Sequence, residues 1–386
     1  MVEGFADNGY EAVRDVFQRL HDEGRETGAG LSVWRDGREV VNLSAGWRDA
    51  DRRHPWTAGT LVQTYSVSKP FVALIALAAV REGALDLDTP VAAYWPAYAA
   101  GGKDTVTLRH VLTHQAGQPR FPDSARRLDP LDDTALRDAL AAAAPEYAPG
   151  TAMGEHAMTY GHLVDGILRA ATGATLDDVY TEKVRPALGL DAWFAVPDEQ
   201  LHRVADLEPS TAHNWDERPS APWLAVPAGV LDPELVNSRA WRQSVFGAVN
   251  LHATASSMAG FFATLRDEDG PLRALLGPEL HAAFITSQVT GHDHVFGTRL
   301  SWTLGLIRDK GKIAKGGIGG AAAWLSLRHG HGVAYLTRHL ADHSRAAEVA
   351  AVLGDDLSVV GEDERAGVDE RAGEDEEAGA TETRRR

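Results

Sequence analysis

The sequence predicts an α/β fold in which an antiparallel sheet is flanked by helices and carries an inserted helical lobe. Three observations predict it. Short strand-like runs occur early in the chain, further strand-like runs occur late, and the stretch between them consists of helical patterns and loops punctuated by proline. Strands from both ends of the chain are therefore expected to meet in one sheet, with the helical middle inserted as a separate lobe.

The early elements follow from local patterns. Residues 10–23 place apolar side chains on one helical stripe, which predicts an amphipathic helix. The strand-like runs 31–34 and 40–43 are bridged by Asp36-Gly37, a dipeptide that suits a tight hairpin turn because it tolerates positive φ. Residues 66–82 are strongly apolar, but their longest uninterrupted apolar run has ten residues, whereas crossing a bilayer takes about 20. We therefore expect a buried helix there.

The later elements complete the sheet. Residues 160–171 repeat apolar side chains at helical spacing and are expected to end at Gly173, and Thr254 is the expected N-cap of another helix. Strands are predicted at 302–307, 321–327 and 333–337. These elements assign residues 1–90 and 246–360 to the α/β lobe with the sheet, and residues 91–245 to the inserted helical lobe. Residues 361–386 contain ten acids and five bases in Ala-Gly repeats, which predicts a disordered acidic tail.

Composition excludes several classes of function. The 386 residues include 38 Lys+Arg and 55 Asp+Glu, and the resulting net charge of −17 disfavours nucleic acid and anionic membranes as partners. The chain has no cysteine, which excludes a thiol nucleophile and zinc sites built on sulfur. Residues 1–8 lack the basic and apolar pattern of a secretory signal, so we expect a cytoplasmic protein.

A candidate nucleophile stands at the start of the apolar helix, in Ser66-Val67-Ser68-Lys69. Residues three apart share one face of a helix, so Lys69 lies within reach of the Ser66 hydroxyl. The helix N-terminus favours a negative charge beside it, and a serine with a lysine base is a recognised nucleophile pair. Taken alone, the spacing also fits a surface serine that caps a helix.

Further motifs follow Ser66 in order along the chain. They are Leu85-Asp86-Leu87-Asp88-Thr89-Pro90, Leu108-Arg109-His110-Val111-Leu112-Thr113-His114, Pro149-Gly150-Thr151, Tyr160-Gly161, Asn250 to Thr254, and Lys315-Gly316-Gly317-Ile318. Together with Ser66 to Lys69 they resemble the serine β-lactamase-like superfamily, most closely its class C-like branch, which holds the family VIII carboxylesterases and related acyltransferases and transacylases. The resemblance covers about residues 10–355 and implies a β-lactamase/penicillin-binding-protein-like fold without cofactor or metal.

The resemblance assigns roles to particular residues. It makes Ser66 the acylated nucleophile and Lys69 its proton acceptor. It places Lys315, Gly316 and Gly317 along an edge strand that lines the site and binds substrate, with Lys315 supplying a cation for a substrate carboxylate or for tuning Lys69. Backbone N–H groups of Ser66 and Ile318 would then form the oxyanion hole.

One position departs from the family pattern. The family has a tyrosine a few residues after Pro-Gly-Thr, and this chain has Glu155 there. An ionised Glu155 near Lys69 would favour the ammonium form and make that lysine a poor base. Glu155 is then the proton acceptor itself, or shares a proton with Lys69 as a coupled pair, or is turned away into solvent. Tyr160 could instead fill the family role, although its place on an apolar helix stripe favours core packing.

These assignments predict a serine hydrolase or acyltransferase that forms an acyl-enzyme at Ser66 from a small ester or amide. Water as acceptor makes it a carboxylesterase, whereas an amine or alcohol makes it a transacylase, for which family members that build antibiotics by ester-to-amide exchange are a precedent. The alternatives are a β-lactamase or D-amino peptidase, and an inactive homologue that only binds ligands. His292-Asp293-His294 and His329-Gly330-His331 resemble metal pairs but lack a third ligand, so no metal is expected.

Overall fold

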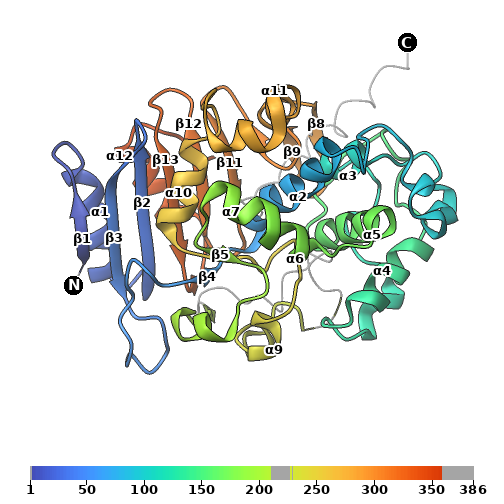
Figure 1. Cartoon of the computed structure of the whole chain (residues 1–386). Coiled ribbons are helices and arrows are strands. Elements are labelled where there is room, and N and C mark those ends of the chain that lie inside the picture. Colours follow the sequence, from blue (N-terminus) through green and yellow to red (C-terminus); the bar gives the residue numbers. More distant parts are fainter. Residues whose placement is uncertain (1, 210–226, 228, 359–386) are drawn as a thin grey trace, which may run out of the picture.

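The computed structural model describes residues 2–209, 227 and 229–358. Its centre is a nine-stranded sheet in which every neighbouring pair is antiparallel (Figure 1). In spatial order the strands are β1 (Glu3–Ala6), β3 (Arg38–Gly46), β2 (Gly28–Arg35), β13 (Gly332–Thr337), β12 (Ala322–Ser326), β11 (Lys312–Gly316), β10 (Ile307–Arg308), β9 (Thr298–Trp302) and β8 (Val289–Asp293). β2 and β13 pair with Leu31 opposite Tyr335, so the two ends of the chain meet in one sheet, as the sequence predicts.

Helices cover both faces of this sheet. α1 (Glu11–Asp22) and α12 (Ser344–Val352) pack on one face, where Phe17 and Val349 join a buried cluster with the sheet residues Leu31, Trp324 and Tyr335. α10 (Ala255–Ala263) packs on the other face and lies in front of the sheet in Figure 1. Thr254 caps α10 by accepting a hydrogen bond from the Ser257 amide, as predicted.

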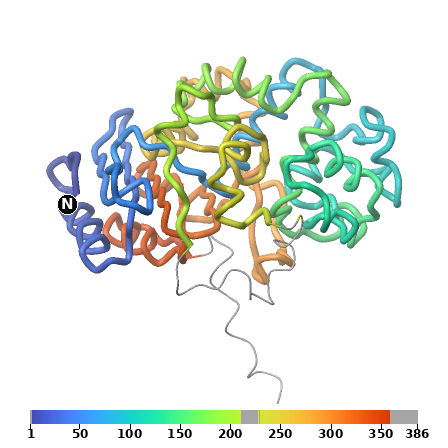
Figure 2. Tube along the Cα trace, turned by 90° about the horizontal axis from the view of Figure 1, so that it is seen from below, coloured from blue at the N-terminus to red at the C-terminus, as the bar shows by residue number. Residues whose placement is uncertain are grey.

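The remaining helices lie between and beside the strands. They are α2 (Lys69–Arg81), α3 (Leu108–Leu112), α4 (Asp133–Ala142), α5 (Tyr160–Thr172), α6 (Leu176–Val179), α7 (Arg185–Leu188), α8 (Pro233–Val236), α9 (Arg239–Arg242) and α11 (Pro271–Ile285). Two small sheets join β4 (Val62–Gln63), β7 (His252–Ala253) and β5 (Ala192–Trp193), and β14 (His339–Leu340) with β6 (Glu208–Pro209). Both views place α4 and α5 at the end of the molecule away from β1 (Figures 1 and 2).

Two strand predictions need correction. Residues 302–307 do not form one strand, because the chain reverses within them: the Thr303 amide donates to Leu306 O at 2.8 Å and Gly305 has φ 103°. Trp302 ends β9, and Ile307 begins β10 opposite it. β11 is also not an edge strand, since β10 follows it in the sheet. Within the described residues, Ile313 and Ala314 are the only residues of β11 that pair with β10, so the Lys315 end of β11 extends past this short neighbour.

The acidic repeat at 361–386 lies outside the described residues. Among the helices of the described ranges, none has both the length and the apolar composition that a bilayer crossing requires.

Candidate active site

Ser66 lies in a 3-10 turn, Tyr65–Ser68, that leads directly into α2. Tyr65 has φ 47°, a left-handed conformation that costs a residue with a side chain about 1–3 kcal/mol and is held only where the surroundings impose it. Ser68 helps to impose it, because its Oγ donates to Tyr65 O at 2.5 Å and accepts from the Leu251 amide at 3.1 Å. The turn before the helix is therefore fixed by the segment around β7, and Ser66 is presented at the beginning of α2.

Lys69 occupies the first turn of α2, one turn after Ser66. Its Nζ donates to Ser66 Oγ at 2.7 Å and to the Ala157 carbonyl at 2.8 Å, and its side chain is fully buried. The structure thus brings together the serine and the lysine that the sequence pairs. A neutral amine at this distance can accept the Ser66 proton directly.

Glu155 points into the same cluster. Its Oε1 lies 3.4 Å from Lys69 Nζ and makes a closer contact with Lys315 Nζ, so two lysine amino groups meet at one carboxylate oxygen. The carboxylate has no exposed surface, which excludes the alternative in which Glu155 is turned into solvent. The cluster of Ser66, Lys69, Glu155 and Lys315 is hereafter called the acyl site.

Lys315 reaches Glu155 from β11. Its side chain is 1% exposed, and its Nζ lies 4.7 Å from the ring centroid of Trp302 and 5.8 Å from that of Phe296. An ammonium near aromatic faces is stabilised when water is excluded. The sequence leaves open whether Lys315 binds a substrate carboxylate or tunes Lys69. In the structure its ammonium contacts the Glu155 carboxylate, which also lies near Lys69. The sequence does not identify Trp302 and Phe296 as site residues, because only the folding of β9 and the β8–β9 turn beside β11 brings their rings near Lys315.

Tyr160 is the alternative that the sequence offers for the family tyrosine. Its ring is buried at the start of α5 and lies 4.9 Å from that of His114, and its hydroxyl donates to the Leu112 carbonyl at 3.4 Å. Burial, and then the charge of Glu155, raise the pKa of Tyr160. These contacts fit a core side chain that packs behind the acyl site.

Two buried histidines line the acyl site without forming part of its ion pairs. His114 Nδ1 accepts from the His156 amide at 3.1 Å, and the His114 ring packs edge-on against Trp302 with centroids 4.2 Å apart. Burial holds the pKa of His114 well below its ordinary value and lowers the pKa of His156 to about 4. Both rings are therefore neutral at physiological pH, and the charge of the site is carried by lysine and carboxylate groups instead of histidine.

The end of β11 lies against the nucleophile turn. A Cβ built on Gly317 would lie 2.3 Å from Thr64 O and 3.3 Å from the Ser66 amide nitrogen. Only glycine permits this approach, which places the residue before Ile318 beside the Ser66 N–H. Ser66 is the second residue of its turn, where an amide has no intrahelical acceptor. The close packing supports the proposed pairing of Ser66 and Ile318 amides as an oxyanion hole.

Gly317→Ala is expected to separate β11 from the nucleophile turn. Because the added methyl would meet a backbone carbonyl, the strand must shift, and we expect acylation to slow by about a hundredfold, the cost of removing one oxyanion donor. The measurement is the rate of Ser66 labelling by a fluorophosphonate. Gly311→Ala is the control for a general effect of a substituted glycine, because Gly311 does not need a positive φ and a Cβ there would meet only Asp309 Oδ1, at an ordinary 3.6 Å. Equal labelling rates for both variants would contradict the prediction.

Each of the two histidine motifs brings its two rings close together. The ring centroids of His292 and His294 lie 5.5 Å apart, and those of His329 and His331 lie 5.9 Å apart. The described residues contain no group of three or more histidine, cysteine or acidic side chains arranged to hold a metal ion.

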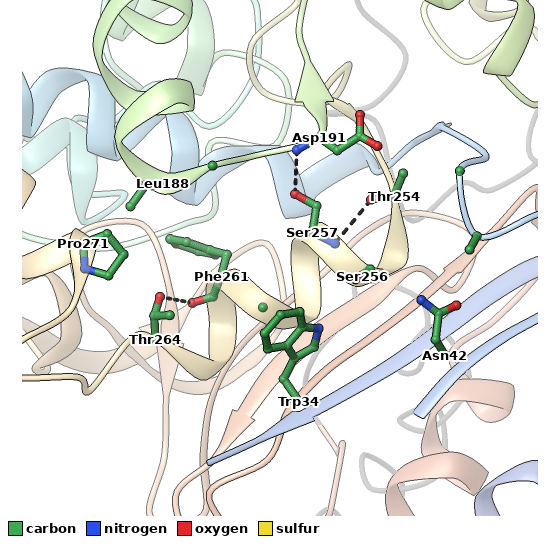
Figure 3. Close-up of a pocket in the computed structure, with 14 residues that line it drawn as sticks. Trp34, Asn42, Leu188, Asp191, Thr254, Ser256, Ser257, Phe261, Thr264 and Pro271 are labelled. Carbon is green, nitrogen blue, oxygen red and sulfur yellow. Dashed lines mark hydrogen bonds between the residues drawn. The ribbon is translucent and has the colours of Figure 1, made fainter. Parts of the chain in front are cut away.

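A pocket of about 550 Å³ lies elsewhere, between α10 and strands β2 and β3 (Figure 3). Trp34, Asn42 and Phe261 are among its lining residues, whereas no member of the acyl site lines it. It is therefore a separate feature of the surface.

Comparison with known proteins decides the family. The sequence model described as Beta-lactamase matches residues 13–355. The chain belongs to the beta-lactamase family. The resemblance drawn from the motifs and the fold class are thereby confirmed.

Two solved structures share the architecture of this beta-lactamase family member over most of their length. A penicillin-binding protein homologue from Caulobacter crescentus is 31% identical, with a TM-score of 0.77 over 90% of this chain and 98% of that one. A family VIII carboxylesterase is 28% identical, with a TM-score of 0.79 over 91% of this chain and 98% of that one.

Curated relatives within the beta-lactamase family match over shorter stretches. Esterase/beta-lactamase LipL of Mycobacterium tuberculosis is 34% identical over 209 residues, which are 53% of this chain and 48% of LipL. Esterase EstB of Burkholderia gladioli is 30% identical over 207 residues, which are 49% of this chain and 52% of EstB. The chain thus spans about half the length of these relatives.

Proposed function

We propose that this protein is a serine-dependent acyl-transfer enzyme that forms an acyl-enzyme at Ser66 from a small ester. The 2.7 Å contact between Ser66 Oγ and Lys69 Nζ, buried at a helix start beside the glycines of β11, carries the proposal. Esterase names among the relatives LipL and EstB support it.

The proposed first step is attack by Ser66 on the ester carbonyl. Ser66 Oγ forms a bond to the carbonyl carbon while the neutral Lys69 amine takes its proton. The N–H groups of Ser66 and Ile318 stabilise the resulting oxyanion. When the oxyanion collapses, the bond to the leaving alkoxide breaks and the Lys69 ammonium protonates it, which leaves an acyl ester on Ser66.

Glu155 is proposed to tune this proton transfer. Its carboxylate is already neutralised by the closer Lys315 ammonium, and the positive charge of Lys315 disfavours a second ammonium at Lys69. Lys69 and Glu155 therefore hold a proton as a coupled pair rather than as independent groups. In the second step this pair removes the proton from the incoming acceptor, which is water for a carboxylesterase and an amine or alcohol for a transacylase.

The burial of Lys315 favours neutral esters over carboxylate-bearing donors. A β-lactam or a D-amino peptide brings a carboxylate, and recognition of it by Lys315 would require displacing Glu155 from a buried ion pair. Breaking such a pair costs several kcal/mol. This observation supports an ester substrate over the β-lactamase and D-amino peptidase alternatives.

Covalent labelling tests the proposal. A fluorophosphonate should add once to the protein, at Ser66, and p-nitrophenyl esters should give an acyl-enzyme visible by intact mass. Adding amines or alcohols during ester turnover then separates hydrolysis from transfer by the products formed. No adduct with either reagent would instead favour the ligand-binding homologue.

The two lysines are expected to differ. Lys69→Arg keeps a cation but removes the ability to lose a proton at neutral pH, so turnover should fall by about a hundredfold or more. Lys315→Arg keeps the cation that neutralises Glu155, so its loss should be milder. Steady-state kinetics on a p-nitrophenyl ester, with melting temperatures to correct for folding, make the comparison. Equal losses would count against separate roles.

A further inference from the structure

Asp293 ends β8 and is fully buried beside the acyl site. Its Oδ1 accepts hydrogen bonds from three backbone amides, those of Glu155 at 3.2 Å, Val295 at 2.9 Å and Phe296 at 3.0 Å. Its Oδ2 accepts from Trp302 Nε1 at 2.9 Å. One carboxylate thus joins the segment around Glu155 to the β8–β9 hairpin.

Three hydrogen-bond partners of Asp293 belong to residues whose side chains surround the acyl site, namely Glu155, Phe296 and Trp302. The Glu155 backbone carries the carboxylate that meets Lys69 and Lys315. The rings of Trp302 and Phe296 flank the Lys315 ammonium. Asp293 touches none of the reacting atoms, but it holds both the carboxylate segment and the aromatic wall of Lys315.

We propose that Asp293 is a positioning residue that fixes the Glu155–Lys315 ion pair and, through its charge, sets the pH at which the Lys69–Glu155 pair becomes active. This inference rests on the proposed function of the acyl site. Asp293, the central residue of His292-Asp293-His294, therefore holds backbone amides and the Trp302 indole in place and does not serve as a metal ligand.

The hydrogen-bond donors around Asp293 indicate that its carboxylate is ionised. All four partners donate N–H groups, which an ionised carboxylate accepts and which a protonated one would satisfy less well. Burial raises the pKa of Asp293, and the amide and indole donors oppose that rise. Glu155 and Tyr147 interact electrostatically with Asp293 directly. Lys69, Lys315, His114 and His156 surround the Glu155 carboxylate, and His292 and His294 flank Asp293 in the chain.

The sign of the expected pH effect follows from charge. Activity requires the Lys69–Glu155 pair to lose a proton, which makes the cluster more negative. An ionised Asp293 opposes that loss. Removing its charge should therefore move the acidic limb of the rate profile to lower pH.

Asp293→Asn is the main test. The amide oxygen can still accept the three backbone N–H groups, but the negative charge is gone, and the amide NH2 cannot accept the hydrogen bond from Trp302 Nε1. We expect kcat to fall by about ten- to a hundredfold, as when a supporting residue of a site is lost. KM should change little, and the acidic limb should move down by at least about half a pH unit. A purely structural role would lower the melting temperature without moving the limb.

Asp165→Asn is the matched control. Asp165 is also a buried aspartate, and it accepts from the Leu176 amide at 2.8 Å, from Arg137 Nη1 at 2.7 Å and from Arg169 Nε at 2.6 Å. Its variant should lose stability but keep the wild-type pH profile. If Asp293→Asn and Asp165→Asn give the same unshifted limb, the positioning role is overturned.

A structural measurement keeps the inference separate from the proposed function. Crystals of Asp293→Ala should show Glu155 separated from Lys315, whereas crystals of Asp165→Ala should retain the ion pair. An intact ion pair in Asp293→Ala would overturn the inference whatever the enzyme does. If wild-type protein is not acylated at Ser66 and the ion pair is nevertheless broken in Asp293→Ala, the proposed function fails while the anchor role stands.

Discussion

Ser66→Ala is expected to abolish covalent acylation while the fold is preserved. The variant keeps the helix and the buried lysine but removes the hydroxyl oxygen that lies 2.7 Å from Lys69 Nζ and would attack the carbonyl. Intact mass after incubation with a fluorophosphonate or a p-nitrophenyl ester should show no adduct. Turnover should fall by about a thousandfold or more, to the level left by binding and oxyanion stabilisation alone.

Ser68→Ala is the matched control for that prediction. Ser68 Oγ holds the turn through Tyr65 O and the Leu251 amide, so its loss leaves a buried amide without its acceptor. Such a loss costs about 1–3 kcal/mol of stability. The variant should therefore melt earlier and still be acylated. If Ser68→Ala is inert and Ser66→Ala is labelled, the nucleophile has been assigned to the wrong serine.

Glu155→Gln is expected to have the second large effect. The amide preserves shape but removes basicity and charge, so turnover should fall at least about a hundredfold if the carboxylate takes part in proton transfer. The wild-type rate should rise with pH, and the apparent pKa of this rise should belong to the Lys69–Glu155 pair as a whole. That limb should shift or vanish in the variant. Full turnover with an unaltered profile would make the carboxylate a bystander.

Glu155→Gln also leaves Lys315 buried without its anionic partner, which can destabilise the protein by about 3–5 kcal/mol. The double variant Glu155→Gln/Lys315→Met removes both charges and separates the two effects. If Glu155 serves only to neutralise Lys315, the double variant should recover turnover. If Glu155 handles the proton, the double variant should recover stability alone.

Glu155→Tyr restores the residue that the family has at this position. If the departure has changed the choice of acceptor, this variant should hydrolyse simple esters faster and transfer acyl groups to amines more slowly than the parent. The ratio of amide to acid product in one reaction, followed at several amine concentrations, measures the change. An unchanged ratio would show that Glu155 does not govern the acceptor.

The parts of the acyl site that sequence could predict are local ones. Ser66 and Lys69 are one helical turn apart, so their contact follows from helix geometry. Glu155 stood out because the resemblance supplied an expected tyrosine. Its contact with Lys315 could not be predicted, because the two residues are 160 positions apart and their distance depends on how β11 packs against the segment after Gly150.

The same division holds for the fold. Helices α1, α5 and α10 followed from apolar periodicity and from end signals such as Gly173, which has φ 76°. The single strand predicted at 302–307 is wrong because β9 and β10 are short and the chain reverses between them within an apolar run. The sequence marks Asp293 only through its histidine neighbours, since a buried carboxylate that anchors backbone amides has no sequence pattern of its own.

The pairing of β2 with β13 has a consequence for synthesis. Strand β2 needs as its neighbour a strand whose last residue is Thr337, so most of the chain must leave the ribosome before the middle of the sheet can close. Until then the β2–β3 hairpin and the apolar helix α2 are exposed in the nascent chain. Contacts of such long sequence separation fold slowly and leave unpaired strand edges open to association. We therefore expect yield in a heterologous host to depend on growth temperature and chaperone supply more than on the stability of the finished fold.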